Sequence, residues 1–367
     1  MKYKVSQLEP YFSGEEIENL KKVIENAWIT EGPFSKEFIE QIKKFTGAKY
    51  AVLANNGTLA LYLSLLALDL ERDDEVIVAD FSFNASASSV VFAGATPVFV
   101  DILESDLCID PKKIEEAITE KTKAIMPVHV YGQSCDMDAI MEIAKKHDLK
   151  VLEDAAQGFG VFYKGKHLGT IGNLGIISFF ADKTITTGEG AVVLTNDEEI
   201  YEKLKMLRNQ GRPHSGTFVH PALGMNFRMT DLQCAVGVAQ VNKFKEIERL
   251  KLKHYNLYKE LLKDQKEIRF IEENDHSNIV PFRTNIRAEK LEKLLDYLEK
   301  NGIQTRRFFY PLHRQPCYAY LGFKEGDLPV SNKAYEEGLS LPVFCNLKEE
   351  QIRYVCKTIK DFYEKEA

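Results

Sequence analysis

The alternation of short apolar runs with helix-like segments is the feature that most constrains this fold. The apolar runs are KYAVLANN (49–56), DEVIVAD (74–80), TPVFVDI (96–102), TKAIMPVHV (122–130) and LKVLEDAA (149–156). Helix-like segments follow at 57–68, 81–94, 111–119 and 137–148. Short apolar strands joined by helices predict an α/β domain with a mostly parallel sheet covered on both faces. Ligands of such sheets bind at the carboxyl ends of the strands.

The alternation of strand and helix patterns changes after a long helical segment predicted at 229–263. The strand-like stretches IRFIEEN and IVPFRTNI, the helix-like EKLEKLLDYLEKNG and a final helix at 348–364 predict a smaller α+β domain. A chain of 367 residues is long enough for two domains. We therefore predict a large domain over residues 1–250 and a small C-terminal domain over residues 251–367.

Composition narrows the class of protein. The chain is 44% hydrophobic and 28% charged, so it can bury a large core. Its net charge of −7 comes without a clustered basic segment, which argues against a nucleic-acid partner. No apolar run reaches the ~18 residues of a membrane span. The six cysteines form no C-x-x-C pair, so we expect no metal site and reduced thiols in a cytoplasmic protein.

A single lysine, Lys183, lies between the two apolar runs of ISFFADKTITTGEGAVVLTN (177–196). A lysine among apolar residues at a strand end can lose its proton and act as a nucleophile. The alternative, a solvated lysine in a loop, is the common case for an isolated residue. The residues at the other strand ends must therefore show whether Lys183 is a nucleophile or a solvated lysine.

A pyridoxal 5′-phosphate (PLP) enzyme needs a lysine, an acid for the ring nitrogen, a phosphate cradle at a helix N-terminus and an aromatic face. Asp154 ends a strand and is the candidate acid. The other candidates are Gly57 and Thr58 at a helix start, Ser178 in a strand, Phe83 just past a strand and Gln157. Each has an ordinary structural explanation as a cap, strand, core or turn residue. Their order on successive strand ends favours the cofactor.

Motifs along the whole chain resemble the DegT/DnrJ/EryC1/StrS family of sugar aminotransferases. They are NNGTLALYLSLLAL, DEVIVADFSFNASASSVVFAGATPVFVDI, MPVHVYGQSCDM, VLEDAAQGFG, SFFADKTITTGEGA and GMNFRMTDLQCAVGVAQV. The resemblance implies PLP-dependent transferase fold type I, which is similar to that of aspartate aminotransferase. KTITTGEG, FFYPLHRQPCY and LPVSNKAYEEGLSLPV resemble the GDP-perosamine synthase type within the family.

The resemblance also implies roles for individual residues. Lys183 matches the Schiff-base lysine, Asp154 the partner of the pyridinium nitrogen, and Gln157 the residue beside the ring hydroxyl. Phe83 matches the stacking aromatic, while Gly57, Thr58 and Ser178 match phosphate contacts. Asn226 matches an asparagine that reaches the cofactor phosphate of a neighbouring subunit, which implies a homodimer with shared sites. The candidate substrate contacts are Trp28, Thr30, Glu189, Arg306, Tyr310 and His313.

One position departs from the family pattern, because Ala191 replaces the last glycine of Gly-Glu-Gly-Gly. A methyl group is tolerable there if the backbone is extended with negative φ.

The resemblance implies transfer of an amino group from L-glutamate to C4 of a nucleotide-linked 4-keto-6-deoxy sugar. GDP-4-keto-6-deoxy-D-mannose is the expected acceptor and GDP-perosamine the expected product, in the biosynthesis of a surface polysaccharide such as O-antigen. Two alternatives stay open: the same chemistry on a UDP- or dTDP-linked keto sugar, and a regulatory protein that keeps the fold without catalysis.

Overall fold

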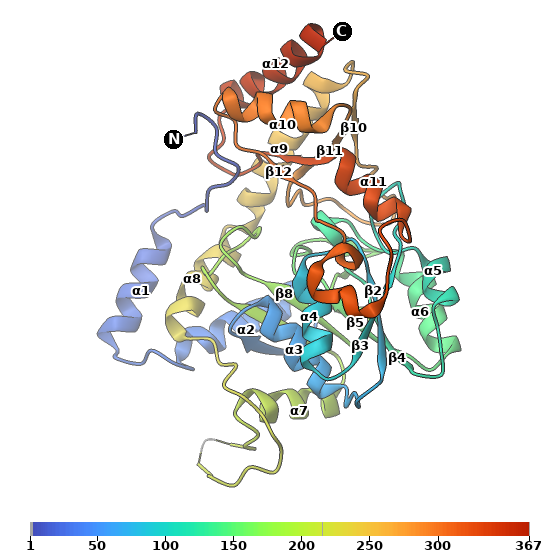
Figure 1. The fold of residues 1–367 in the computed structure, drawn as a ribbon. Helices are drawn as coiled ribbons and strands as arrows, with labels where there is room; N and C mark the ends of the chain where they lie inside the picture. Colours follow the sequence, from blue (N-terminus) through green and yellow to red (C-terminus); the bar gives the residue numbers. More distant parts are fainter. Residues whose placement is uncertain (1–2, 215, 367) are drawn as a thin grey trace.

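A seven-stranded sheet forms the centre of the protein, as Figure 1 shows for the computed structural model. The structure describes residues 3–214 and 216–366. The strand order is β1-β9-β8-β5-β4-β2-β3. Its strands are β1 (Tyr50–Ala54), β2 (Glu75–Ala79), β3 (Thr96–Val100), β4 (Thr122–Met126), β5 (Lys150–Asp154), β8 (Leu174–Ser178) and β9 (Ala191–Thr195). Strand β9 is antiparallel to both neighbours and the other adjacent pairs are parallel, which confirms the predicted mostly parallel sheet.

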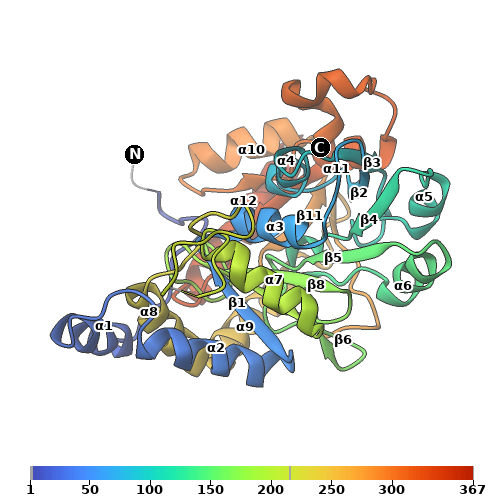
Figure 2. The ribbon, with the colours of Figure 1, turned by 90° about the horizontal axis from the view of Figure 1, so that it is seen from below.

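Helices cover both faces of this sheet because successive strand residues point to opposite sides. Val52 and Ala54 of β1 pack in one hydrophobic cluster with α3 (Gly57–Ala67), α4 (Asn84–Phe92) and α7 (Glu198–Arg208). Ala51 and Leu53 pack in another. The helices of that second cluster include α2 (Pro33–Thr46), α5 (Pro111–Glu116), α6 (Met137–Lys146) and α8 (Asp231–Asn242). Helix α1 (Glu15–Glu25) packs against α8, and Figure 2 shows these helices around the sheet from below.

A second, antiparallel sheet lies at the carboxyl-terminal end of the chain, with strand order β10-β11-β13-β12. Its strands are β10 (Ile268–Phe270), β11 (Thr284–Ala288), β12 (Arg306–Arg307) and β13 (Gly338–Leu341). The helices around it are α9 (Phe244–Leu262), α10 (Leu291–Lys300), α11 (Pro329–Glu337) and α12 (Glu349–Glu366). The beginning of the chain joins this unit, since the backbone amide of Lys4 donates to the carbonyl of Gly302 (2.9 Å).

The predicted long helix at 229–263 is two helices, α8 and α9, which meet at Lys243. Helix α8 starts sharply at Thr230, whose hydroxyl accepts from the amide of Gln233 in a capping box. The two ends of α9 lie in different cores. Phe244 packs beneath the large sheet and Tyr258 packs with the smaller sheet. The predicted domain boundary near residue 250 falls within this helix.

The remaining elements are short. They are the strands β6 (Phe162–Tyr163) and β7 (Lys166–His167) and the 3₁₀ helices η1 (Val130–Gly132), η2 (Leu312–Arg314) and η3 (Pro316–Leu321). Within 3–214 and 216–366, no helix has both the length and the apolar character needed to cross a bilayer. The same residues contain no cluster of metal-ligating side chains, and all six cysteines are free.

Candidate active site

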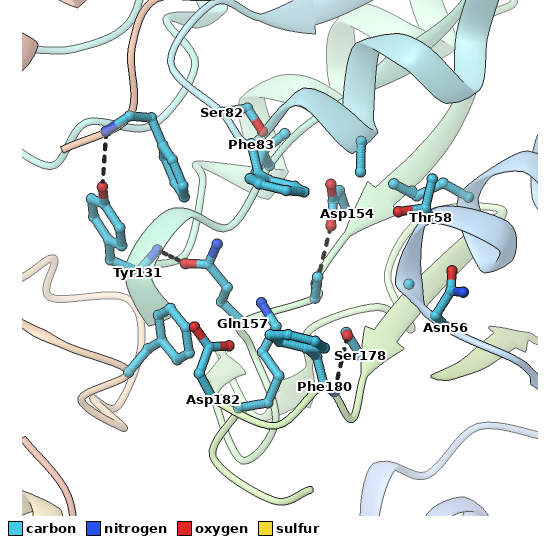
Figure 3. A pocket seen from close by; sticks show the side chains of 18 of the residues that line it. Asn56, Thr58, Ser82, Phe83, Tyr131, Asp154, Gln157, Ser178, Phe180 and Asp182 are labelled. Atoms are coloured by element: carbon cyan, nitrogen blue, oxygen red, sulfur yellow. Dashed lines mark hydrogen bonds between the residues drawn. The ribbon is translucent and has the colours of Figure 1, made fainter. Parts of the chain in front are cut away.

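A cavity of about 660 Å³ lies where the carboxyl ends of the parallel strands face the smaller sheet. Side chains from both sheets line it, and Figure 3 shows the strand-end residues directed into it. Nine of the residues predicted from the sequence are in its lining: Gly57, Thr58, Phe83, Asp154, Gln157, Ser178, Lys183, Glu189 and Arg306. The fold thus brings together residues from strand ends that are far apart in the chain.

Lys183 occupies the corner between β8 and β9. Its backbone amide donates to the carbonyl of Phe180 (2.9 Å), which tightens the turn. The side chain is half-buried, and its Nζ lies 4.8 Å from the centroid of the Phe282 ring. Burial lowers the pKa of Lys183 below the usual lysine value, against the opposing charges of Asp182 and Asp154. A lowered pKa increases the fraction of neutral amine, the form that can attack a carbonyl carbon.

Asp154 ends β5 and is held rigidly at the cavity wall. Its Oδ2 accepts from the Ser86 hydroxyl (2.7 Å), and its Oδ1 accepts from the amide of Ala156 (3.2 Å). The Ser86 hydroxyl also lies 2.7 Å from that of Ser82, so a chain of hydroxyls supports the acid from helix α4. A carboxylate positioned in this way can pair with a cationic ring nitrogen.

The start of α3 forms an anion cradle. Asn56 caps the helix by accepting from the amide of Leu59 (3.0 Å), while the amides of Gly57 and Thr58 precede any intrahelical acceptor. A Cβ at Gly57 would lie 3.2 Å from the hydroxyl oxygen of Ser178, so only glycine leaves this space open. Free amides, a hydroxyl and the positive end of a helix dipole fit a phosphate group.

The space between the cradle and the smaller sheet suits a flat ring. Phe83 is 61% exposed on its own chain, and its ring centroid lies 6.3 Å from that of Phe309. Gln157 is oriented by its Oε1, which accepts from the amide of Tyr131 (2.6 Å) and leaves the NH₂ group free for the cavity (Figure 3). Tyr131 has a left-handed backbone (φ 56°), a strained conformation typical of functional sites.

The cavity lining also contains charged residues, Asp182 and Arg283, that the sequence analysis did not select. Asp182 pairs with Arg283 (2.6 Å), which directly precedes β11, and with Arg306 (3.3 Å) at the start of β12. Tyr131 and Phe282 also line the cavity without having been predicted. Asp182 is next to the predicted lysine, and that was the available signal. The arginine that pairs with it is 101 positions away, so no local pattern could identify the pair.

Three predicted residues lie on the surface of the chain, outside the cavity lining. Trp28 is 61% exposed, and Thr30, which is also exposed, forms a β-bridge with Thr230. Asn226 is exposed too, and its Oδ1 accepts from the amide of Arg228 (3.1 Å). In the part of the chain that the structure describes, these side chains do not reach the cavity.

Two further predicted substrate contacts, the buried His313 and the half-buried Tyr310, pack against other side chains instead of lining the cavity. The imidazole of His313 is buried, with Nδ1 2.8 Å from Oδ2 of Asp80. Its backbone amide donates to the other oxygen of the same carboxylate (2.7 Å). Tyr310 packs edge-on against the Tyr335 ring, at 5.0 Å between centroids. The geometry gives His313 a structural task, which is to anchor η2 to the end of β2.

Ala191 is the first residue of β9 and is fully buried between Ala54 and Ser178 on the neighbouring strands. Its backbone is extended and is not among the left-handed residues. The methyl group therefore occupies ordinary strand geometry, as tolerance of this substitution required.

The model of the DegT/DnrJ/EryC1/StrS aminotransferase family matches residues 10–360. The chain belongs to this family. Its relatives are named as aminotransferases and synthases. The prediction of a sugar aminotransferase is therefore confirmed.

Among curated relatives, a protein of Escherichia coli O157:H7 named GDP-perosamine synthase is 37% identical over 99% of both chains. Proteins of the same name from Caulobacter vibrioides and Vibrio cholerae also match. A protein of Geobacillus stearothermophilus named pleiotropic regulatory protein is 40% identical and covers 94% of this chain and 93% of its own length. A UDP-2-acetamido-2-deoxy-3-oxo-D-glucuronate aminotransferase from Pseudomonas aeruginosa is 34% identical, covering 93% and 94%.

Solved structures share the whole fold. The S. venezuelae protein DesV, in complex with a ketimine intermediate, has a TM-score of 0.94 and 30% identity, with 99% of both chains covered. The PMP form of Streptococcus pneumoniae Spr1654 has a TM-score of 0.94 and 28% identity, with 100% of this chain and 98% of that chain covered. The predicted fold and the predicted PLP cofactor are confirmed. The open cradle at Gly57 and the fixed carboxylate of Asp154 fit that cofactor.

Proposed function

We propose that this enzyme transfers the amino group of L-glutamate to C4 of GDP-4-keto-6-deoxy-D-mannose and so forms GDP-perosamine. The observation that carries the proposal is the near full-length similarity to proteins named GDP-perosamine synthase. The complete set of cavity residues that PLP chemistry requires supports it.

Residues at the ends of four strands, β1, β2, β5 and β8, would hold the cofactor. We assign its phosphate to the amides of Gly57 and Thr58 and to the hydroxyl of Ser178. Asp154 would pair with the ring nitrogen, and the free NH₂ group of Gln157 would donate to the ring oxygen. Phe83 would stack on the ring. When bound, PLP supplies an aldehyde and an electron-withdrawing ring.

Lys183 performs the proton transfers. Because burial lowers the pKa of its amine, a neutral fraction is available to accept the proton from the α-carbon of glutamate. In the second half-reaction the ammonium group of Lys183 donates a proton to C4 of the sugar. The apolar walls formed by Phe180, Phe282 and Phe309 limit the access of water to these transfers.

Charged groups of the lining suit an anionic substrate. Arg306 is half exposed and makes one ion pair, at 3.3 Å, so its remaining N–H groups can bind a diphosphate or a carboxylate. Burial raises the pKa of Glu189, which can accept from a sugar hydroxyl at the cavity rim. We keep Trp28, Thr30 and Tyr310 as proposed acceptor contacts made from outside this lining. The buried imidazole of His313 is not among them.

We further propose a homodimer with sites shared between subunits. Large apolar side chains are exposed on α1, on the loop after it and in the segment before α8, namely Ile17, Ile24, Trp28, Ile29, Phe218, Val219, Leu223 and Met225. Exposed apolar groups of this size favour burial in an interface. Asn226 lies in the same segment, where it can reach the cofactor phosphate of a second subunit.

A panel of acceptors tests the proposal. The enzyme is given ¹⁵N-labelled glutamate and GDP-, dTDP- or UDP-linked 4-keto-6-deoxy sugars, and the products are analysed by mass spectrometry. We expect label in the GDP sugar. Label only in a UDP or dTDP sugar would instead support the alternative acceptors; the name of the Pseudomonas relative contains a UDP-linked one.

The Geobacillus relative is named a regulatory protein, so a regulatory function is the second alternative. Absorbance separates it from an enzyme. Purified protein loaded with PLP should show a near-visible band that borohydride bleaches, because the cofactor is attached to a lysine. A protein that takes up no PLP would favour the regulatory alternative.

A further inference from the structure

One ion pair connects the Lys183 corner to the smaller sheet. Asp182 lies in the turn between β8 and β9, and its Oδ2 is 2.6 Å from a guanidinium nitrogen of Arg283. The side chains are 10% and 7% exposed, so the pair is shielded from solvent. Arg283 directly precedes β11, so the contact crosses from the large sheet to the smaller one. Figure 3 shows Asp182 at the cavity edge.

Several cations meet at the ring of Phe282. The Nζ of Lys183 lies 4.8 Å from the ring centroid, the guanidinium carbon of Arg283 lies 4.7 Å from it, and the Nζ of Lys251 lies 5.9 Å from it. Lys251 is buried, and burial lowers its pKa to about 8. Like charges this close repel one another in a low-dielectric site, so a carboxylate such as Asp182 must balance them.

The charged groups that face the Lys183 amine act in opposite directions. The negative charges of Asp182 and Asp154 favour the ammonium form. The positive charges of Arg283 and Arg306 favour the neutral form and add to the effect of burial. The protonation of the Lys183 amine therefore depends on both members of the Asp182–Arg283 pair.

We propose that the Asp182–Arg283 ion pair is a positioning device for Lys183, which fixes its turn against the smaller sheet and balances the charge around its amine. The inference rests on the proposed function only in taking Lys183 as the nucleophile. It assigns a task to two residues that make no hydrogen bond to that amine.

Removal of Arg283 and removal of Asp182 should shift the pH at which Lys183 loses its proton in opposite directions. Removing the guanidinium in Arg283→Met leaves the Asp182 carboxylate unbalanced, so Lys183 should hold its proton to higher pH. Removing the negative charge in Asp182→Asn leaves Arg283 unbalanced, so Lys183 should lose its proton at lower pH. The double variant should lie between the single variants, because both charges are gone.

Competitive labelling measures this directly. Full-length protein freed of cofactor is exposed briefly to acetic anhydride over a pH series, and acetylation of the Lys183 peptide is quantified by mass spectrometry. We expect the midpoint to rise in Arg283→Met and to fall in Asp182→Asn. Each shift should be at least about half a pH unit, which is about a threefold change in rate at fixed pH.

Two controls separate this effect from simple damage to a buried ion pair. Arg287→Met removes a buried arginine on β11 that pairs with Glu104 (3.2 Å), and it should leave the Lys183 midpoint unchanged. Arg283→Lys keeps the positive charge and should restore a midpoint close to that of the wild type. Circular dichroism confirms that each variant is folded.

Midpoints that stay at the wild-type value, or that move in the same direction in both single variants, would overturn the proposal. If Arg283→Met does not fold, the lowered midpoint of Asp182→Asn against the wild-type midpoint of Arg283→Lys still decides. The labelling needs no sugar nucleotide. A failure of the GDP-perosamine assignment would therefore leave these midpoints unaffected and could be distinguished.

Discussion

Replacing His313 separates a structural role from a substrate role. The sequence placed this residue among the substrate contacts, whereas its ring is buried beside Asp80, 2.8 Å from Nδ1 to Oδ2. The ring Nε2 lies 3.3 Å from the carbonyl of Glu325. His313→Ala therefore removes a partner from a buried carboxylate and leaves the cavity lining untouched.

The size of the effect follows from this burial. Breaking a buried charged pair by removing one partner costs about 3–5 kcal/mol. An unfolding entropy of about 2.1 cal/mol/K per residue amounts to about 0.8 kcal/mol/K for 367 residues, so Tm should fall by about 4–6 °C. The matched variant His276→Ala alters an exposed imidazole outside the proposed interface and should change Tm by less than about 1 °C.

The loss should depend on pH. Burial alone would lower the pKa of His313, but the hydrogen bond and charge of Asp80 outweigh it and raise the pKa above the ordinary value. A raised folded-state pKa stabilises the fold fully below the unfolded value of about 6.5, and this contribution disappears as pH rises through the folded-state pKa. The Tm deficit of His313→Ala should therefore be larger at pH 6 than at pH 9.

Scanning calorimetry at both pH values and steady-state kinetics on the folded variant complete the test. We expect a lowered Tm and a KM for the sugar nucleotide within about twofold of wild type, since the side chain does not line the cavity. An unchanged Tm together with a markedly raised KM would refute the structural role and return His313 to the substrate site.

Three further predictions concern the cofactor site. Lys183→Ala should abolish both the borohydride-sensitive band and turnover with an unchanged far-ultraviolet spectrum; retained turnover would contradict the assignment. Mixing Lys183→Ala with Asn226→Ala subunits should restore about a quarter of wild-type activity, since half the dimers are mixed and each has one intact site; no recovery would argue against shared sites. Gly57→Val should weaken PLP binding at least about tenfold in a fluorescence titration, because its branched side chain fills the phosphate cradle. Wild-type affinity would place the phosphate elsewhere.

Much of the fold could be predicted because its signals are local. A buried parallel strand needs a short continuous apolar run, and a helix that follows it needs good helix formers, so the element order was readable along residues 49–156. The break between α8 and α9 was missed. Lys243 interrupts a segment whose composition is helical on both sides. Val238 before it and Phe244 after it pack in the same core, so neither composition nor burial marks the break.

Some residues of the candidate site could be predicted from local sequence patterns and others could not. Gly57, Asp154 and Lys183 could be chosen because each lies at a strand end, and a parallel sheet gathers such ends at one edge. Arg283 could not be chosen, because a Phe-Arg pair ahead of a strand has no distinctive pattern. His313 was assigned to the substrate because a motif indicates neighbours in sequence and does not reveal which way a side chain points.

The sequence by itself determined the class of fold and the cofactor, and it proposed residues to hold that cofactor, because these depend on short motifs and on their order along the strands. Only the tertiary structure decided which charges surround the nucleophile and which histidines, His313 among them, are buried. The physical reason is distance along the chain: Asp182 meets Arg283 across 101 positions, and Asp80 meets His313 across 233. Contacts of that range come from the packing of the C-terminal part of the chain against the end of the large sheet, which no local pattern records.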